Sequence, residues 1–256
     1  MATFSMARRF FIGDIHGHYD GLQRLWEIMD PGSDDRVYAV GDLIDRGPQS
    51  SDVVNFVRRH THGCVRGNHE QLILDAFAGG QINLPSLQGW IYSGGQATLT
   101  SYINCPDVLE DHLVWLSQLP LYIDLGDLWL VHAGVNPALP LAVQSSYELC
   151  WIRDTFHSSA TPFFSDKLII TGHTITFTFP TVNPGQLVAG CGWLDIDTGV
   201  YHPRSGWLTA LDWDNQMVYQ VNVFEPLERI LPLTEAMIKL DPALLKRGRR
   251  GFSTRS

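Results

Sequence analysis

The sequence Arg-Phe-Phe-Ile-Gly-Asp-Ile-His-Gly, residues 9–17, starts as an apolar run and ends in a carboxylate and an imidazole. The apolar residues predict a buried strand, and the polar residues mark its end. Side chains two positions apart share one face of a strand, so Asp14 and His16 are predicted to point toward a common centre. Such a pair can hold a metal ion, but it also occurs often by chance, and the rest of the chain must decide.

The composition is that of a globular protein, because 45% of the 256 residues are hydrophobic and 18% are charged. This length fits one large domain or two small ones. The formal net charge of -9 argues against general nucleic-acid binding, which depends on basic residues that neutralise phosphates. No apolar stretch reaches the length of a membrane span, and only three apolar residues follow Arg8 and Arg9, too few for a signal peptide.

The cysteines are scattered, without the short spacing of a zinc site or a disulfide framework. Reduced thiols in the cytoplasm are therefore expected for all four, which are Cys64, Cys105, Cys150 and Cys191. A cytoplasmic protein without nucleic-acid or membrane partners is the resulting expectation.

Short apolar runs and helical patterns alternate along the first 77 residues, which is the pattern of an α/β protein. Helices are predicted over 17–29, 51–60 and 71–77, and strands over 36–40 and 63–66. Polar residues follow each strand, namely Asp42 after the first and Asn68-His69 after the second. Later apolar runs end in the same way at His132 and His173. Because ligands of open α/β sheets gather at the carboxyl ends of strands, these side chains are predicted to lie together.

We expect the whole chain, residues 1–256, to form one domain, in which the remaining segments are an inserted cap, further strands and a tail. Glycine and proline break residues 79–112 into short aromatic pieces, which predicts an inserted helical cap. Residues 193–197, 207–213 and 217–224 predict antiparallel strands. A short amphipathic helix is predicted over 237–245, followed by a solvated basic tail over about 246–256.

The polar residues at the strand ends form a donor set of oxygen and imidazole without thiolate. This set suits divalent metals such as manganese, iron, zinc or nickel. If Asp42 bridges two ions, they would lie about 3.5 to 4 Å apart and lower the pKa of a shared water toward about 7.

Five motifs together resemble the metallophosphoesterase superfamily, and within it the phosphoprotein phosphatase branch. They are Gly13-Asp14-Ile15-His16-Gly17, Gly41-Asp42-Leu43-Ile44-Asp45-Arg46-Gly47, Gly67-Asn68-His69-Glu70, Val131-His132-Ala133-Gly134 and Thr171-Gly172-His173-Thr174. That branch includes Ser/Thr protein phosphatases, the phosphatase of bacteriophage lambda and symmetrical diadenosine tetraphosphatases. The resemblance implies a four-layer αββα sandwich of two mixed sheets flanked by helices, with a small helical cap.

The resemblance also implies the site residues. Asp14 and His16 would bind a first metal, Asp42 would bridge, and the second metal would be held by Asn68, His132 and His173. Two divalent ions are expected, with manganese as first choice and iron, zinc, nickel or cobalt as alternatives.

The catalytic groups implied by the family are an acid, its carboxylate partner and two phosphate-binding arginines. His69 matches the acid that protonates the leaving oxygen, and Asp45 matches the partner that orients it. Arg46 and Arg153 match the arginines, with a surface salt bridge as the alternative role of Arg153.

Three functions follow in order of preference. The first is dephosphorylation of phosphoserine and phosphothreonine proteins by in-line attack of a hydroxide that bridges the metals. The alternative is symmetrical hydrolysis of dinucleoside polyphosphates, or of another phosphorylated nucleotide. The third is a non-catalytic scaffold, which the presence of every expected ligand and of His69 disfavours. The oligomeric state is left open.

Overall fold

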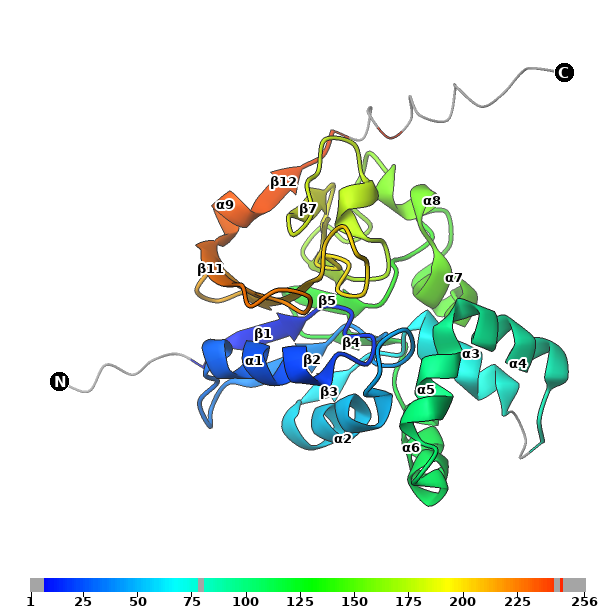
Figure 1. The fold of residues 1–256 in the computed structure, drawn as a ribbon. Coiled ribbons are helices and arrows are strands. Elements are labelled where there is room, and N and C mark those ends of the chain that lie inside the picture. Colours follow the sequence, from blue (N-terminus) through cyan, green and yellow to red (C-terminus); the bar gives the residue numbers. More distant parts are fainter. Residues whose placement is uncertain (1–6, 78–80, 242–244, 246–256) are drawn as a thin grey trace, which may run out of the picture.

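The computed structural model describes residues 7–77, 81–241 and 245, and in them the strands form two six-stranded sheets (Figure 1). Both sheets are mixed, since each contains parallel and antiparallel neighbours. In these ranges no helix is both long and apolar enough to cross a membrane.

The first sheet has the spatial order β11-β10-β9-β1-β2-β3. β1 (Arg9–Ile12) lies at its centre, parallel to β2 (Arg36–Ala39) and antiparallel to β9 (Trp207–Asp212). The other members are β3 (Gly63–Cys64), β10 (Met217–Asn222) and β11 (Glu228–Pro232). Strands from both ends of the chain therefore build one sheet.

The second sheet has the order β12-β7-β8-β6-β5-β4. β6 (Leu168–Thr171) lies between β5 (Leu128–Val131) and β8 (Trp193–Asp195), parallel to both. The outer strands are β4 (Tyr122–Asp124), β7 (Leu187–Gly190) and β12 (Met237–Lys239).

The continuous apolar runs in the sequence reflect strands that are buried on both faces. In β1, Phe10 and Ile12 pack against the helices on one side, whereas Phe11 enters the core between the sheets. In β5, Leu130 enters the same central core and Trp129 packs on the opposite side. Such alternation across two sheets produces four layers. The expected αββα sandwich is therefore confirmed.

Helices cover the outer faces of both sheets. The core on the outer face of the first sheet includes residues of α1 (Tyr19–Met29), α2 (Ser50–His60) and α3 (Asn68–Ala76) (Figure 1). On the second sheet, α7 (Ser146–Trp151) and α8 (Asp154–His157) contribute Leu149 and Phe156 to the core. Short helices also occur at η3 (Leu141–Val143), η4 (Thr176–Thr178) and α9 (Leu233–Ala236).

The inserted segment is helical, and its helices lie together at one end of the molecule beside α3 (Figure 1). It contains α4 (Leu84–Trp90), the π-helical turn η2 (Ile91–Gly95), α5 (Gln96–Ser101) and α6 (Pro106–Ser117). These helices contact α2 and α3, and Trp90 is fully buried among them. The segment is thus packed against the body of the protein.

The prediction of a helix over 237–245 is wrong, because residues 237–239 form β12, which pairs in parallel with β7. Met237 packs in the core between the sheets, and Ile238 packs on the opposite face. This alternation is that of a strand, and a pattern of so few residues fits either structure. The predicted basic tail, 246–256, lies outside the described residues.

Candidate metal and phosphate site

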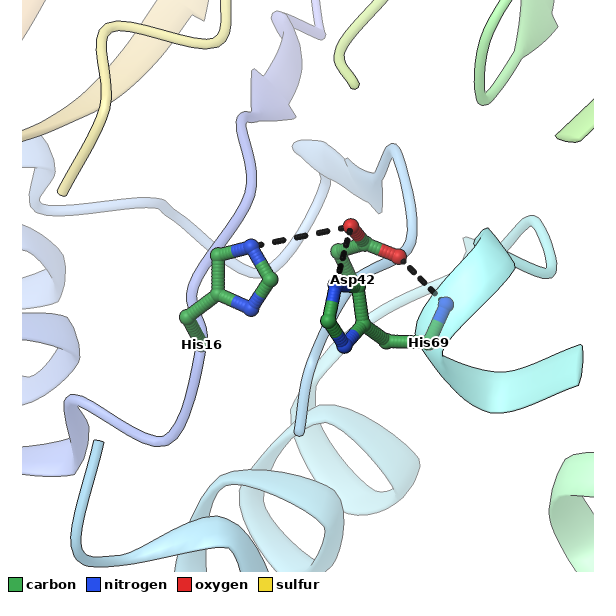
Figure 2. A group of neighbouring side chains, drawn as sticks. All are labelled: His16, Asp42 and His69. Carbon is green, nitrogen blue, oxygen red and sulfur yellow. Dashed lines mark hydrogen bonds and ion pairs between the residues drawn. The ribbon is translucent and has the colours of Figure 1, made fainter. Parts of the chain in front are cut away.

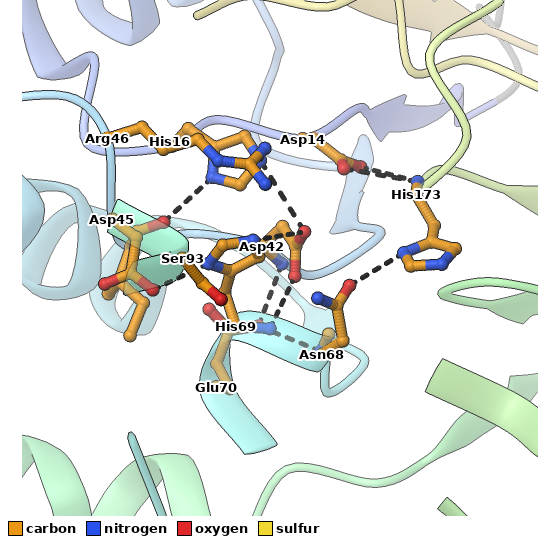
Figure 3. A network of polar contacts seen from close by, with 12 residues as sticks. Asp14, His16, Asp42, Asp45, Arg46, Asn68, His69, Glu70, Ser93 and His173 are labelled. Carbon is orange, nitrogen blue, oxygen red and sulfur yellow. Dashed lines mark hydrogen bonds and ion pairs between the residues drawn. The ribbon is translucent and has the colours of Figure 1, made fainter. Parts of the chain in front are cut away.

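The residues singled out from the sequence lie at the carboxyl ends of parallel strands in both sheets (Figure 3). Asp14 and His16 follow β1, Asp42 follows β2, and Asn68 begins α3 just after β3. The second sheet contributes His132 after β5 and His173 after β6. The site is therefore a shared rim of two sheets, which the sequence pattern alone did not indicate.

Loop geometry brings Asp14 and His16 to the site. The expectation that they share the face of one strand is not met, because β1 ends at Ile12 and His16 has a φ of 47°. A positive φ is uncommon for residues other than glycine, and such strain concentrates at functional sites. Among the described residues, it recurs at four other site positions, which are Asp42, Asp45, Arg46 and His173.

One group of possible metal ligands consists of His16, Asp42 and His69, whose ligand atoms lie within 4.8 Å of one another (Figure 2). All three side chains are buried. Asp42 Oδ2 lies 3.6 Å from His16 Nε2 and 3.9 Å from His69 Nε2. Because His16 Nδ1 faces the carbonyl oxygen of Ile44 at 2.9 Å, Nδ1 carries the proton and Nε2 is left with a lone pair.

The second group consists of Asp42, His132 and His173, again within 4.8 Å of one another. His132 Nδ1 faces the carbonyl oxygen of Val40 at 2.8 Å, which directs Nε2 toward Asp42 Oδ1 at 3.3 Å. Asn68 Oδ1 completes the group, since it lies 2.9 Å from His132 Nε2. It also lies 2.7 Å from His173 Nδ1, a contact that Figure 3 shows. Asp42 belongs to both groups, as a bridging ligand would.

The charges of these side chains fit divalent ions. Burial and Arg46 lower the pKa of His16 well below 6.5, and burial and His132 do the same for His173. Burial acts to raise the pKa of Asp42, but the surrounding histidines, His132 first, hold it well below 3.8. Burial acts to lower the pKa of His132, but the charge of Asp42 holds it above 6.5. Neutral imidazoles and an ionised carboxylate are the forms that bind metals, so a metal ion would bind the neutral form of His132 in place of a proton. The donor set therefore fits metal ions.

Asp14 lies at the same rim but outside both groups. Its carboxylate accepts the backbone N–H of His173 at 3.2 and 3.3 Å. A Cβ on Gly172 would come within 2.1 Å of Asp14 Oδ1, so only glycine allows this approach. Burial, Asp197 and Asp42 raise the pKa of Asp14 well above 3.8, which is the situation of a carboxylate that lacks a neighbouring cation.

His69 and Asp45 form a buried dyad, in which His69 Nδ1 lies 2.6 Å from Asp45 Oδ2. Two residues of the inserted segment hold the Asp45 carboxylate. Trp90 Nε1 donates to both of its oxygens at 2.9 and 3.0 Å, and the Thr98 hydroxyl donates to Oδ1 at 2.6 Å. Trp90 and Thr98 both fall in the predicted cap at 79–112, but the sequence assigns neither of them a role. An apolar pattern cannot reveal that an indole N–H faces a carboxylate.

Glu70, to which the sequence assigned no role, fixes the loop that carries Asp42. Its fully buried carboxylate accepts the backbone N–H groups of Asp42, Leu43 and Gly67 at 2.8 to 2.9 Å. Burial and the charge of Asp42 raise the pKa of Glu70 to about 7, whereas the donors oppose that shift. The side chain thereby joins the ends of β2 and β3.

A cavity of about 140 Å³ opens over these residues, lined by Asp42, Arg46, Asn68, His69, Arg153, His173, Ile175, Thr178 and Tyr201. The Arg46 guanidinium stacks on the Tyr201 ring at 3.9 Å and donates to His16 Nε2 at 2.9 Å. Arg153 donates to the His173 carbonyl oxygen and to the Thr174 hydroxyl, each at 3.1 Å. Two guanidinium groups therefore line a cavity whose floor carries the candidate metal ligands.

Comparisons with known proteins agree with this arrangement. A family model described as calcineurin-like phosphoesterase matches residues 7–193. The chain is 37% identical over 141 residues to a symmetrical bis(5'-nucleosyl)-tetraphosphatase of Dechloromonas aromatica (strain RCB), an alignment that covers 54% of this chain and 45% of that protein. The chain thus spans about half the length of the curated relatives it matches.

Solved structures share the fold. A crystal structure described as a candidate diadenosine tetraphosphatase has a TM-score of 0.58 at 21% identity, covering 85% of this chain and 94% of the other. A cold-active protein tyrosine phosphatase has a TM-score of 0.55 at 18% identity, covering 89% and 79%. Since the family model covers most of the sequence, the chain belongs to the calcineurin-like phosphoesterase family of metal-dependent hydrolases.

Proposed function

We propose that this phosphoesterase cleaves dinucleoside polyphosphates symmetrically, so that diadenosine tetraphosphate yields two molecules of ADP. The sequence alone favoured phosphoproteins as substrates. The 37% identity to a symmetrical bis(5'-nucleosyl)-tetraphosphatase supports the alternative function more strongly, since the likeness to protein phosphatases is one of fold at under 25% identity.

The choice between the two substrates rests on that relative, and one observation of the site is consistent with it, namely that Arg46 and Arg153 both line the cavity above Asp42 and Asn68. A phosphomonoester presents one phosphoryl group, whereas a dinucleoside polyphosphate carries negative charge on both sides of the bond that breaks. A guanidinium group binds phosphate oxygens in a bidentate fork. Two of them in one cavity therefore suit a polyphosphate chain.

The same side chains divide the chemical work. Two divalent ions would be held by Asp14, His16, Asp42, Asn68, His132 and His173, and when bound such ions polarise phosphoryl oxygens and supply hydroxide near neutral pH. Arg46 and Arg153 bind the phosphate oxygens. His69 donates a proton to the leaving oxygen, and Asp45 keeps its ring oriented by accepting from Nδ1.

We also propose that the whole chain is one domain with its cap at about 79–112. The burial of Trp90 against Asp45 supports this view, because the cap then completes the surroundings of the acid. In this arrangement the cap is part of the catalytic apparatus as well as a cover.

A product analysis tests the proposed function. The purified protein is incubated with diadenosine tetraphosphate and manganese, and the nucleotides are separated by ion-exchange chromatography. ADP as the only nucleotide product is expected, whereas equal amounts of AMP and ATP would show asymmetric cleavage. A phosphoserine peptide is assayed at equal enzyme concentration. Faster release of phosphate from the peptide than of ADP from the dinucleotide would overturn the proposal.

A further inference from the structure

A second cavity, of about 250 Å³, lies next to the candidate metal site. Its lining residues are Asn136, Tyr147, Glu148, Trp151, Ile152, Arg153 and Thr155. Arg153 lines this cavity and the phosphate cavity alike. The Trp151 ring lies 6.2 Å from the ring of His173, measured between centroids. The two cavities are therefore neighbours that share one cationic side chain.

Two aromatic side chains line one wall of the second cavity. Tyr147 and Trp151 are four residues apart on α7, a spacing that places them on the same face of a helix. Tyr147 is 75% exposed and Trp151 is 37% exposed, so both rings are accessible to a ligand in the cavity. Exposed aromatic rings are platforms on which nucleobases stack.

The helix that carries these rings is held firmly. Ser145 and Glu148 form a capping box at its start, since the Ser145 N–H donates to Glu148 Oε2 at 2.8 Å and the Ser145 hydroxyl oxygen accepts the N–H of Tyr147 at 3.2 Å. The carbonyl oxygen of Leu149 accepts the N–H of Ala133, the residue after His132, at 2.9 Å. The aromatic wall is thus fixed relative to a candidate metal ligand, which lowers the entropic cost of binding.

We propose that Trp151 and Tyr147 form a nucleobase subsite, which holds the base of a nucleotide whose phosphates lie in the neighbouring cavity. Arg153, between the two cavities, binds a phosphate oxygen on the nucleoside side of the reacting phosphoryl group. The proposal rests on the proposed function for its class of ligand. It assigns one nucleoside of a dinucleoside polyphosphate to α7, whereas the phosphoserine side chain itself has no ring that could stack there.

The test compares two non-hydrolysable ligands that differ only by a nucleoside. These are the α,β-methylene analogue of ADP and methylenediphosphonate, and their dissociation constants are measured by calorimetry on the full chain with manganese. Trp151→Ala is expected to weaken binding of the ADP analogue about tenfold and to change binding of methylenediphosphonate less than about twofold. Trp151→Phe keeps an aromatic face and is expected to retain most of the affinity for the ADP analogue.

Tyr92→Ala is the matched control, because Tyr92 is 95% exposed on the cap and belongs to the lining of neither cavity. It is expected to leave both dissociation constants unchanged. A larger loss for Tyr92→Ala than for Trp151→Ala would place the base on the cap and overturn the proposal. Equal weakening of both ligands by Trp151→Ala would also overturn it, since Trp151 would then support the phosphate site only.

This binding experiment is independent of the turnover assay. If the protein does not cleave diadenosine tetraphosphate, but Trp151→Ala weakens binding of the ADP analogue alone, the subsite is supported and the proposed function is refuted. If the protein produces ADP, but Trp151→Ala does not weaken binding of the ADP analogue more than binding of methylenediphosphonate, the proposed function is supported and the subsite is refuted.

Discussion

Asp42 is the residue on which both candidate ligand groups converge. Its two carboxylate oxygens face imidazoles from different sheets, His16 from the first and His132 from the second. The backbone N–H of His69 also donates to Oδ1, at 3.0 Å. A side chain that bridges two cations needs a negative charge as well as two oxygen atoms, and the amide of an asparagine at this position would have the same size but no charge.

Asp42→Asn is accordingly expected to reduce bound metal from about two ions per chain to about one or none, and to lower activity at least about a thousandfold. Metal content is measured by plasma mass spectrometry after gel filtration. Asp75→Asn is the control, because Asp75 is exposed on α3 and its carboxylate accepts a hydrogen bond from the Gln71 side chain, away from the site. Full metal content in Asp42→Asn would contradict a bridging role.

His69 offers a test of acid catalysis that depends on the leaving group. An alkoxide leaving group needs a proton much more than a nitrophenolate does, so loss of a general acid costs about 10²-fold or more for the former and little for the latter. His69→Asn is therefore expected to depress kcat/KM for an alkyl phosphate far more than for p-nitrophenyl phosphate. Equal losses would indicate that His69 acts as a metal ligand beside His16 and Asp42.

At the scale of elements, the inserted helices reach the site through α4 and α5. Trp90, at the end of α4, and Thr98, on α5, both donate to the Asp45 carboxylate that orients His69. The sequence predicts that these helices exist, because glycine and proline divide the segment into short pieces. It does not predict their target, since the partner of an indole N–H depends on how α4 packs against α3.

Trp90→Phe removes the indole N–H while keeping an aromatic ring. Loss of a hydrogen bond to a charged acceptor is expected to cost about 1.5 to 3 kcal/mol of stability. The variant should also reproduce, more weakly, the leaving-group dependence of His69→Asn. Urea denaturation and kcat/KM for the alkyl and aryl phosphates provide the two measurements.

The control for that substitution is Trp26→Phe on α1, where the indole packs against Phe56 and His60 on the outer face of the first sheet. It should change stability without altering the ratio of alkyl to aryl activity. If Trp90→Phe behaves in the same way as this control, α4 serves only to cover the site.

The strands that precede the candidate ligands, and the order of those ligands, were predictable because each of these strands is an apolar run followed by a polar residue. His16 and Asp42 could be chosen from their motifs, but their left-handed backbone could not, since it follows from loops packed between two sheets. A binding role for Tyr147 and Trp151 could not be predicted from the sequence either, because it depends on their position beside a cavity. Short sequence motifs thus predict the candidate metal ligands better than they predict the side chains that hold those ligands in place.

At the scale of the whole molecule, the outer core of the second sheet encloses an unusual buried pair. His157 Nε2 lies 3.7 Å from Asp195 Oδ2, and neither atom has a hydrogen-bond partner among the described residues. Burial, followed by the charge of Arg153, lowers the pKa of His157 to about 3. Burial and Asp197 raise the pKa of Asp195 well above 3.8, so both shifts favour the neutral forms of the pair.

This pair predicts a pH dependence of stability. Between pH 6.5 and about 3, the unfolded chain takes up a proton at His157 and the folded protein does not, so His157 by itself makes stability fall as the pH falls, by up to about 1.4 kcal/mol per pH unit. The raised pKa of Asp195 contributes in the opposite direction, and a comparison with a variant that lacks only His157 isolates the first contribution. His157→Phe keeps a ring beside Phe179 and Trp193 and removes this titration. Urea denaturation from about pH 6 to about pH 4.5 should give a shallower slope for the variant. Identical slopes would show that His157 is protonated in the folded state.

The central place of β1 has a consequence for where this protein can be divided. The family match ends at Trp193, yet β9, at 207–212, hydrogen-bonds to β1, and the Gly13 N–H donates to the Thr209 carbonyl oxygen at 2.9 Å. A chain cut after Trp193 would keep all six candidate metal ligands but leave β1 as an unpaired edge. Such edges pair with other chains and aggregate. The smallest unit able to fold is therefore longer than the segment that carries the catalytic motifs.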